Sequence, residues 1–346
     1  MRSLTYCDAL KEAQLQEMER DPNIFMYGIG VPDHNTIFGS VAGIYDKFGE
    51  QRCFDTPLSE DTMMGFGLGA ALNGLKPINI HIRVDFLMLA MNQLANMVSI
   101  YQYMSGGLLK VPLVIRAVIG RGWGQGAQHS KSLQSVFAHI PGLKVIMPTT
   151  AKDAKGMLIA AIRDTNPVLM FEHRWLYWQE DDVPEDPYTA PLEGASVLKK
   201  GSDLTIVATS WMNVEALRAS EILEKIGISV EIVDVRVLSP LNPEVIINSV
   251  KKTGHCIIAD NDWTFCGYSA ELAAVIGQTC FGKLKKPIER IGFAFTPCPT
   301  VRCLENEFYP NAINIIRSVE EILGLSQTDL TGEEFYSHEK RFKGPF

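Results

Sequence analysis

Residues 54–86 read FDTPLSEDTMMGFGLGAALNGLKPINIHIRVDF, a loop followed by a glycine-rich stretch and a short apolar run. Residues 62–74 have the composition of a helix and residues 77–82 that of a buried strand. Gly65, Gly67 and Gly69 lie inside the expected helix, whereas a dinucleotide-binding G-x-G-x-x-G turn directly follows a strand. We therefore expect a helix whose small residues let another helix approach closely at an interface.

The same alternation of helices and strands continues on both sides of this stretch. Thr5 and Asp8 form a weak capping box for a first helix, and NIFMYGIGV at residues 23–31 has the pattern of a strand buried on both faces. Further helices are expected at 87–103 and 151–163, and further strands at 112–117 and 168–172. Strands that alternate with helices predict a parallel sheet covered on both sides.

Residues 176–196 interrupt this pattern with three prolines and an acidic run, which is typical of a linker over the surface. The alternation restarts at a strand over 204–209 and ends at a helix near 312–324. The sequence therefore predicts two doubly wound α/β domains, residues 1–190 and residues 191–346. The second would end in a polar tail over residues 331–346.

Composition excludes several classes of protein. The chain has 346 residues, 46% of them hydrophobic, and a formal net charge of −8. This charge argues against a general affinity for nucleic acid or anionic membranes, and no apolar run approaches the roughly 20 residues that span a bilayer. Seven cysteines without a C-x-x-C pair suggest neither a disulfide framework nor a zinc site. We expect a soluble, cytoplasmic protein.

Two polar residues stand where parallel sheets form their sites, at the junctions between strands and helices. Glu60 precedes the glycine-rich helix, and His129 ends the loop RGWGQGAQHS at residues 121–130. Taken alone, Glu60 is explained as a carboxylate at a helix start, which the helix dipole favours. His129 alone is explained as a surface histidine.

The order of the sequence blocks is more specific than either residue. FDTPLSE, GFGLGAALNGLKP, MSGG, VPLVIR, QHS, HIPGLKVIMP and IRDTNPV follow one another, and GSDLTIVATS and SVKKTGH come later. This order closely resembles the beta subunit of thiamine-diphosphate-dependent 2-oxo-acid dehydrogenases, the pyruvate, branched-chain and acetoin type. The resemblance covers almost the whole chain. It implies a transketolase-like pyrimidine-binding domain followed by a transketolase C-terminal domain.

The resemblance also implies a catalytic site. Glu60 matches the glutamate that hydrogen-bonds a pyrimidine nitrogen of the cofactor and favours the tautomer that activates the thiazolium carbon. Leu58 belongs to the same block, Phe86 matches the aromatic residue that stacks on the pyrimidine, and His129 matches a histidine that lines the pocket and exchanges protons. A potassium ion held by main-chain oxygens would use the matching positions, which are Leu113, Ala161, Ile162, Asp164 and Asn166.

What the chain lacks implies a partner. In related enzymes Mg²⁺ and the diphosphate are held by a Gly-Asp-Gly block and a later pair of asparagines, and this sequence contains neither G-D-G nor N-N. The resemblance therefore implies a separate alpha-type subunit that binds the diphosphate. It further implies an α₂β₂ heterotetramer and a lipoyl acyltransferase as acceptor of the acyl group.

Three positions depart from the family pattern. Ile29 and Gly30 stand where relatives carry acidic residues, which suggests altered proton handling. Arg83 replaces an aromatic or small residue, where it could bind a substrate carboxylate or phosphate, or form a salt bridge with Asp85 or a partner chain. Trp123 would lie near the channel and narrow it. These departures keep an alternative open, a two-chain acyloin synthase or transketolase-like enzyme that delivers the carbanion to an aldehyde or ketone.

Overall fold

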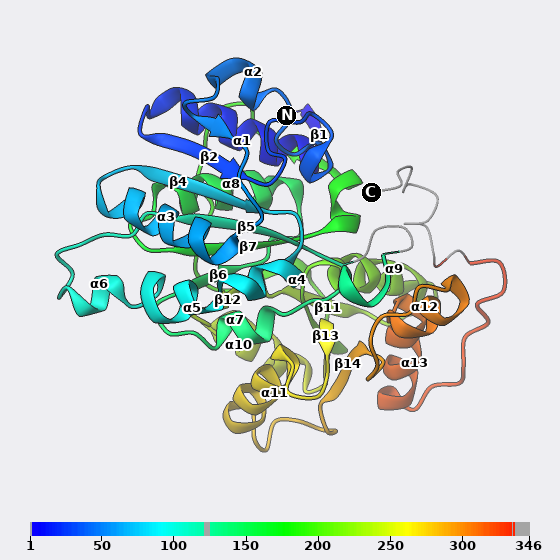
Figure 1. The fold of residues 1–346 in the computed structure, drawn as a ribbon. Coiled ribbons are helices and arrows are strands. Elements are labelled where there is room, and N and C mark those ends of the chain that lie inside the picture. Colours follow the sequence, from blue (N-terminus) through cyan, green and yellow to red (C-terminus); the bar gives the residue numbers. More distant parts are fainter. Residues whose placement is uncertain (1, 121–124, 334, 336–346) are drawn as a thin grey trace.

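The first half of the chain forms most of a seven-stranded sheet (Figure 1). The computed structural model describes residues 2–120, 125–333 and 335. In the order along the sheet β6-β7-β5-β4-β2-β3, neighbouring strands are parallel. Their bounds are Ile24–Gly28 (β2), Cys53–Phe54 (β3), Lys76–His81 (β4), Val114–Ile119 (β5), Lys144–Ile146 (β6) and Val168–His173 (β7).

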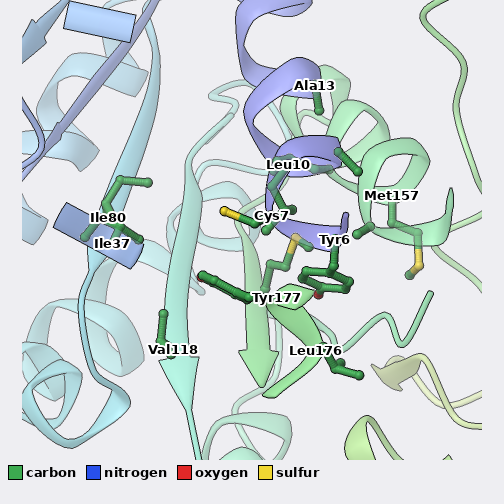
Figure 2. Packing of buried hydrophobic residues seen from close by; sticks show 14 of the residues in the cluster. Tyr6, Cys7, Leu10, Ala13, Ile37, Ile80, Val118, Met157, Leu176 and Tyr177 are labelled. Atoms are coloured by element: carbon green, nitrogen blue, oxygen red, sulfur yellow. The ribbon is translucent and has the colours of Figure 1, made fainter. Parts of the chain in front are cut away.

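Helices cover both faces of this sheet, as the alternation predicts. Helices α1 (Tyr6–Arg20) and α8 (Ala151–Arg163) bury apolar side chains against one face, where Ile80 of β4 and Val118 of β5 belong to the same buried cluster as Leu10 of α1 and Met157 of α8 (Figure 2). Helix α3 (Glu60–Leu72) and the segment after β4 cover the other face. The Thr5 hydroxyl caps α1 by accepting a hydrogen bond from the Asp8 amide at 3.0 Å.

The second half forms a five-stranded sheet in the order β14-β13-β10-β11-β9. Strand β9 is antiparallel to its neighbour and the other pairs are parallel. The strands are Ser196–Lys199 (β9), Leu204–Ala208 (β10), Val230–Asp234 (β11), Cys256–Trp263 (β13) and Glu289–Phe293 (β14). The helices are Trp211–Lys225 (α9), Glu244–Thr253 (α10), Tyr268–Thr279 (α11), Arg302–Phe308 (α12) and Ala312–Leu323 (α13).

The two halves share a core and a strand. Apolar side chains of α10 and α11 belong to the same buried cluster as those of α3 and β5. Strand β12 (Val237–Ser239) comes from the second half but pairs antiparallel with β6, so that it forms an edge of the first sheet. The expected two doubly wound α/β units are confirmed, and each is completed by contacts with the other.

The helix expected at 87–103 is not continuous. The structure has α4 (Val84–Leu87), a 3₁₀ turn (Met88–Ala90), α5 (Met91–Gln93), a π turn (Leu94–Val98) and α6 (Tyr101–Met104). Leu87, Ala90, Leu94 and Val98 are nevertheless all fully buried. Their spacing of three and four residues is that of one helical face, so the apolar face stays against the sheet although the helix is broken into short turns.

The expected linker at 176–196 is partly wrong. Tyr177 is fully buried and its hydroxyl donates a hydrogen bond to Glu172 at 2.6 Å. Strand β8 (Glu180–Val183) pairs antiparallel with β1 (Arg2–Thr5) at the start of the chain. Because the strand that pairs with β8 lies almost 180 residues away, the local sequence carries no signal of the pairing, and the acidic, proline-containing segment resembles a linker.

The predicted tail lies largely outside the described residues. Within the part of the chain that the structure covers, no helix is long and apolar enough to cross a membrane.

Candidate active site

A cavity of about 270 Å³ opens where β2 and β4 end, at the carboxyl edge of the first sheet. Gly28 lets the two strands meet there, because a Cβ atom at this position would lie 2.4 Å from the carbonyl oxygen of Ile80. Besides Ile29, the cavity brings together five residues that the sequence analysis singled out, far apart in the chain. They are Leu58, Glu60, Arg83, Phe86 and His129.

Glu60 is the first residue of α3, where the positive end of the helix dipole favours a carboxylate. Its side chain is half-buried on the cavity wall. Neither a hydrogen bond nor an ion pair involves this carboxylate within the described residues. The next residue, Asp61, does not line the cavity, and its carboxylate accepts a hydrogen bond from the Gln93 side chain at 3.3 Å. Glu60 is therefore available to accept a hydrogen bond from a ligand.

Phe86 and His129 form one wall of the cavity. Their rings meet edge to face, with centroids 5.3 Å apart and an interplanar angle of 68°. Phe86 is 39% exposed and Leu58 is 82% exposed, which is unusual for large apolar side chains beside a cavity. These two residues leave an apolar surface on which a flat ring could pack.

Two polar residues of β4 line the same cavity, and the sequence analysis missed both. The Nε2 atom of His81 lies 2.7 Å from Oδ1 of Asn79. Burial lowers the pKa of His81 to about 4, so that the ring is neutral near pH 7 and the proton on Nε2 faces the Asn79 oxygen. The signal was present in the sequence: Asn79, His81 and Arg83 alternate with isoleucines, which puts three polar side chains on one face of a central strand.

Arg83 lies just beyond β4 and is 1% exposed. Its guanidinium donates hydrogen bonds to the carbonyl oxygen of Gly120 and to Oε1 of Gln125. The salt bridge with Asp85 that the sequence allowed does not form, because Asp85 pairs with Lys131 at 3.0 Å. Burial, followed by repulsion from Arg174, lowers the pKa of Arg83 to about 10, and the side chain stays charged at neutral pH.

The other two departures have different outcomes. The Gly30 amide donates a hydrogen bond to Oδ1 of Asp55 at 2.6 Å, so a carboxylate lies beside the strand end although Ile29 and Gly30 are not acidic. Ile29 itself lines the cavity. Trp123 lies outside the described residues.

The expected potassium ligands lie at the start of β5 and the carboxyl end of α8, and none of them lines the cavity. The Leu113 carbonyl accepts a hydrogen bond from the Val168 amide at 3.0 Å, and the Ala161 carbonyl from the Asp164 amide at 3.2 Å. The Asp164 carboxylate pairs with Lys144 at 2.5 Å. Each carbonyl keeps a second lone pair, but a lysine already neutralises the carboxylate.

Comparisons with known proteins agree with this architecture. Residues 2–179 match the transketolase pyrimidine-binding domain and residues 193–315 match the transketolase C-terminal domain. A solved structure described as a split-gene transketolase, an inactive beta4 tetramer, superposes with a TM-score of 0.74 at 21% identity, covering 94% of this chain and all of the other. At this identity the likeness concerns the fold alone.

Several relatives are similar over almost their whole length. The beta subunit of acetoin:2,6-dichlorophenolindophenol oxidoreductase from Cupriavidus necator is 39% identical, covering 93% of this chain and 98% of the relative. The beta subunit of 2-oxoisovalerate dehydrogenase from Bacillus subtilis is 38% identical, with coverages of 93% and 99%. The mitochondrial pyruvate dehydrogenase E1 beta subunit of Saccharomyces cerevisiae is 38% identical, with coverages of 94% and 90%. On this similarity, the chain belongs to the family of 2-oxo-acid dehydrogenase E1 beta subunits.

Proposed function

We propose that this chain is the beta subunit of a thiamine-diphosphate-dependent 2-oxo-acid dehydrogenase, which decarboxylates a 2-oxo acid and passes the acyl group to lipoyl. The observation that carries the proposal is the cavity that gathers Glu60, Phe86 and His129 at one sheet edge. In this proposal residues 1–190 bind the pyrimidine half of the cofactor. Residues 191–346 form the C-terminal domain, which shares a core with the first.

The residues of the cavity fit the pyrimidine half of the cofactor. An aminopyrimidine needs a carboxylate acceptor at a ring nitrogen and apolar contacts on its faces. The Glu60 carboxylate has no partner within the described residues, and Leu58 and Phe86 expose apolar surface beside it. The neutral His81 adds no charge that would compete for the carboxylate.

The diphosphate half needs a second chain. No group of three or more side chains that could ligate a metal occurs within the described residues, and the full sequence has neither of the family's diphosphate blocks. In the proposal an alpha-type subunit holds Mg²⁺ and the diphosphate, the assembly is an α₂β₂ heterotetramer, and a lipoyl acyltransferase accepts the acyl group. The relatives are named as beta subunits, which supports the presence of an alpha-type subunit.

Four of the cavity residues have a role in this reaction. When bound, thiamine diphosphate supplies the nucleophilic carbon and the electron sink. Glu60 accepts a hydrogen bond from the pyrimidine nitrogen and fixes where the proton resides. Phe86 and Leu58 would orient the ring and exclude water, and His129, which contacts Phe86 on the same wall, would give a proton to the substrate or take one from it. A potassium ion would use the carbonyls of the five positions named above and stabilise the loop after α8.

A tagged pull-down from the native cell tests the proposal, with the co-purifying chains identified by mass. An alpha-type chain together with a lipoyl acyltransferase is the expected result. An alpha-type chain alone would favour the acyloin synthase or transketolase-like alternative, which none of the dehydrogenase relatives named above supports. If no alpha-type chain is recovered, the inference of a half-site is wrong.

A further inference from the structure

The cavity contains a buried positive charge that the reaction described above does not use. Arg83 lines the cavity and is 1% exposed. Two of its N–H groups bond to the Gly120 carbonyl and the Gln125 side chain, which are both uncharged acceptors. Its Nε atom is buried and has no hydrogen-bond partner in the described part of the chain.

The described residues neutralise this charge only in part, because the attraction of Asp85 does not outweigh burial and the repulsion of Arg174, which lower the pKa of Arg83 to about 10. Asp85, the nearest acidic residue in sequence, is held by Lys131. A second cation lies on the same side: the guanidinium carbons of Arg83 and Arg174 lie 5.3 Å and 4.0 Å from the centroid of the same Phe38 ring. Burying a charge without an opposite charge is costly. An anion that enters the cavity would offset that cost.

We propose that Arg83 is an anion-binding residue that selects substrates carrying a second anionic group besides the carboxylate that leaves as CO₂. This proposal rests on the proposed function and names its substrate class: 2-oxo acids with a distal carboxylate, or with a distal phosphate or phosphonate. The hydrogen bonds to Gly120 and Gln125 fix the plane of the guanidinium before the substrate arrives, so little ordering is needed on binding.

The chemistry of decarboxylation favours a distal group over the scissile carboxylate. A carboxylate that departs as neutral CO₂ loses its charge in the transition state, so a cation paired with it would stabilise the ground state more than the transition state and slow the reaction. A distal anion keeps its charge throughout, and its binding energy is available at every step.

The test compares substrates that differ at one end. The complex with its alpha-type subunit is assayed by reduction of 2,6-dichlorophenolindophenol with 2-oxopentanoate, 2-oxoglutarate and 2-oxo-4-phosphonobutanoate. Arg83→Gln removes the charge and Arg83→Lys keeps it. The matched control is Arg52→Gln, because Arg52 also bonds backbone carbonyls and lies over a phenylalanine ring, but does not line the cavity.

Wild-type enzyme should prefer an anionic substrate over 2-oxopentanoate, and Arg83→Gln should lower kcat/KM for that substrate by about 10- to 100-fold, the effect of losing a charge-assisted hydrogen bond. The kcat/KM for 2-oxopentanoate should fall by a clearly smaller factor than kcat/KM for the anionic substrate, and Arg83→Lys should retain part of the preference. The relative effects on 2-oxoglutarate and the phosphonate identify which anion is bound. A wild type without preference, or an equal loss on all substrates in Arg83→Gln, overturns the proposal.

Calorimetric titration separates this proposal from the proposed function. If no 2-oxo acid is turned over, the proposed function fails, and the same compounds are titrated into wild-type and Arg83→Gln complexes. Tighter binding of the dianions than of 2-oxopentanoate, lost in Arg83→Gln, would still support the anion site. Equal binding by both proteins would overturn it.

Discussion

At the residue scale, the cavity depends most on the carboxylate of Glu60. It stands at the start of α3 without a partner in the described residues, and the neighbouring Asp61 bears the same charge in the same turn but bonds Gln93 away from the cavity. Substitutions of Glu60 and Asp61 can therefore be compared. Both remove a negative charge from the start of α3, but only the substitution of Glu60 removes a carboxylate that lines the cavity.

We expect Glu60→Gln to reduce dye reduction by the complex at least about 100-fold, since a positioned acid or base contributes about 10²- to 10⁴-fold. Asp61→Asn is the control and should retain activity near that of the wild type. Size-exclusion chromatography should show intact assembly for both variants. Full activity in Glu60→Gln would exclude the proposed role of this carboxylate.

At the scale of elements, α3 is fitted to β2 through one glycine. A Cβ atom on Gly67 would lie 2.1 Å from the hydroxyl oxygen of Tyr27, whereas a Cβ atom on Gly69 would have no neighbour within 4 Å. The close packing of α3 against Tyr27 of β2 therefore requires a glycine at position 67. Gly69 is not required by this packing, and it remains available for the helix contact that the sequence suggested.

Gly67→Ala should destabilise the isolated chain by about 1–3 kcal/mol through overpacking. Gly69→Ala should leave it unchanged or stabilise it by up to about 1 kcal/mol through helix propensity. Tyr27→Phe removes the clashing oxygen and should rescue most of the loss in Gly67→Ala. Midpoints of urea denaturation measure all three, and a Gly67→Ala loss that Tyr27→Phe does not reduce would contradict the packing explanation.

A second contact between elements joins the two halves through acidic side chains. Gln134 and Ser135 of α7 (Gln134–Ala138) donate hydrogen bonds to Asp260 and Asp262 of β13, at 3.1 Å and 2.9 Å. Burial and the neighbouring Asp260 raise the pKa of Asp262 from 3.8 to about 8. The folded chain therefore keeps a proton on this pair that the unfolded chain loses.

Between pH 4 and pH 8 the folded state binds more protons here than the unfolded state, so the free energy of unfolding should fall as pH rises. The slope is at most about 1.4 kcal/mol per pH unit for one proton. Asp262→Asn cannot ionise and should reduce this slope, with its largest relative benefit near pH 8. The exposed Asp182→Asn serves as a control for charge, and identical pH profiles for wild type and Asp262→Asn would rule out this linkage.

At the scale of the whole molecule, exposed apolar side chains occur in both halves, and many of those in the first half lie on segments that include the cavity residues Leu58 and Phe86. They belong to the loop before α3, to α3 itself and to the segment after β4 (Figure 1). The residues are Leu58, Phe66, Phe86, Met88, Leu89, Tyr103, Met104 and Leu108. An apolar surface of this kind beside a half-site is what a partner subunit would cover.

Leu89→Asp should therefore weaken association with the alpha-type subunit by at least about tenfold, since it puts a charge into an apolar contact. Phe281→Asp, at a residue that is 90% exposed in the second half, should not. Co-purification and analytical ultracentrifugation measure the effect. Equal weakening by both substitutions would show that the contact is not confined to the cavity side.

Several parts of this molecule could be predicted from local sequence. The cap at Thr5 and the alternation of helices and strands are encoded within a few residues, and the structure confirms them. The helix expected at 62–74 forms as well, but it begins two residues earlier, at Glu60. The gathering of Glu60, Phe86 and His129 in one cavity came from the order of sequence blocks that resembles a known family. Their catalytic roles stay predictions.

Other features depend on contacts between distant segments. Arg116 lies in the apolar run of β5, yet it is fully paired with Glu172 and also donates to Gln14 and Ser40. The pairing of β1 with β8 and the addition of β12 to the first sheet join segments far apart in sequence. Local propensity and periodicity thus determine which elements form. Which edges pair is decided only when the folded chain removes these groups from water. The same holds for which charges pair with an opposite charge, as Arg116 does, and which bond to uncharged acceptors, as Arg83 does.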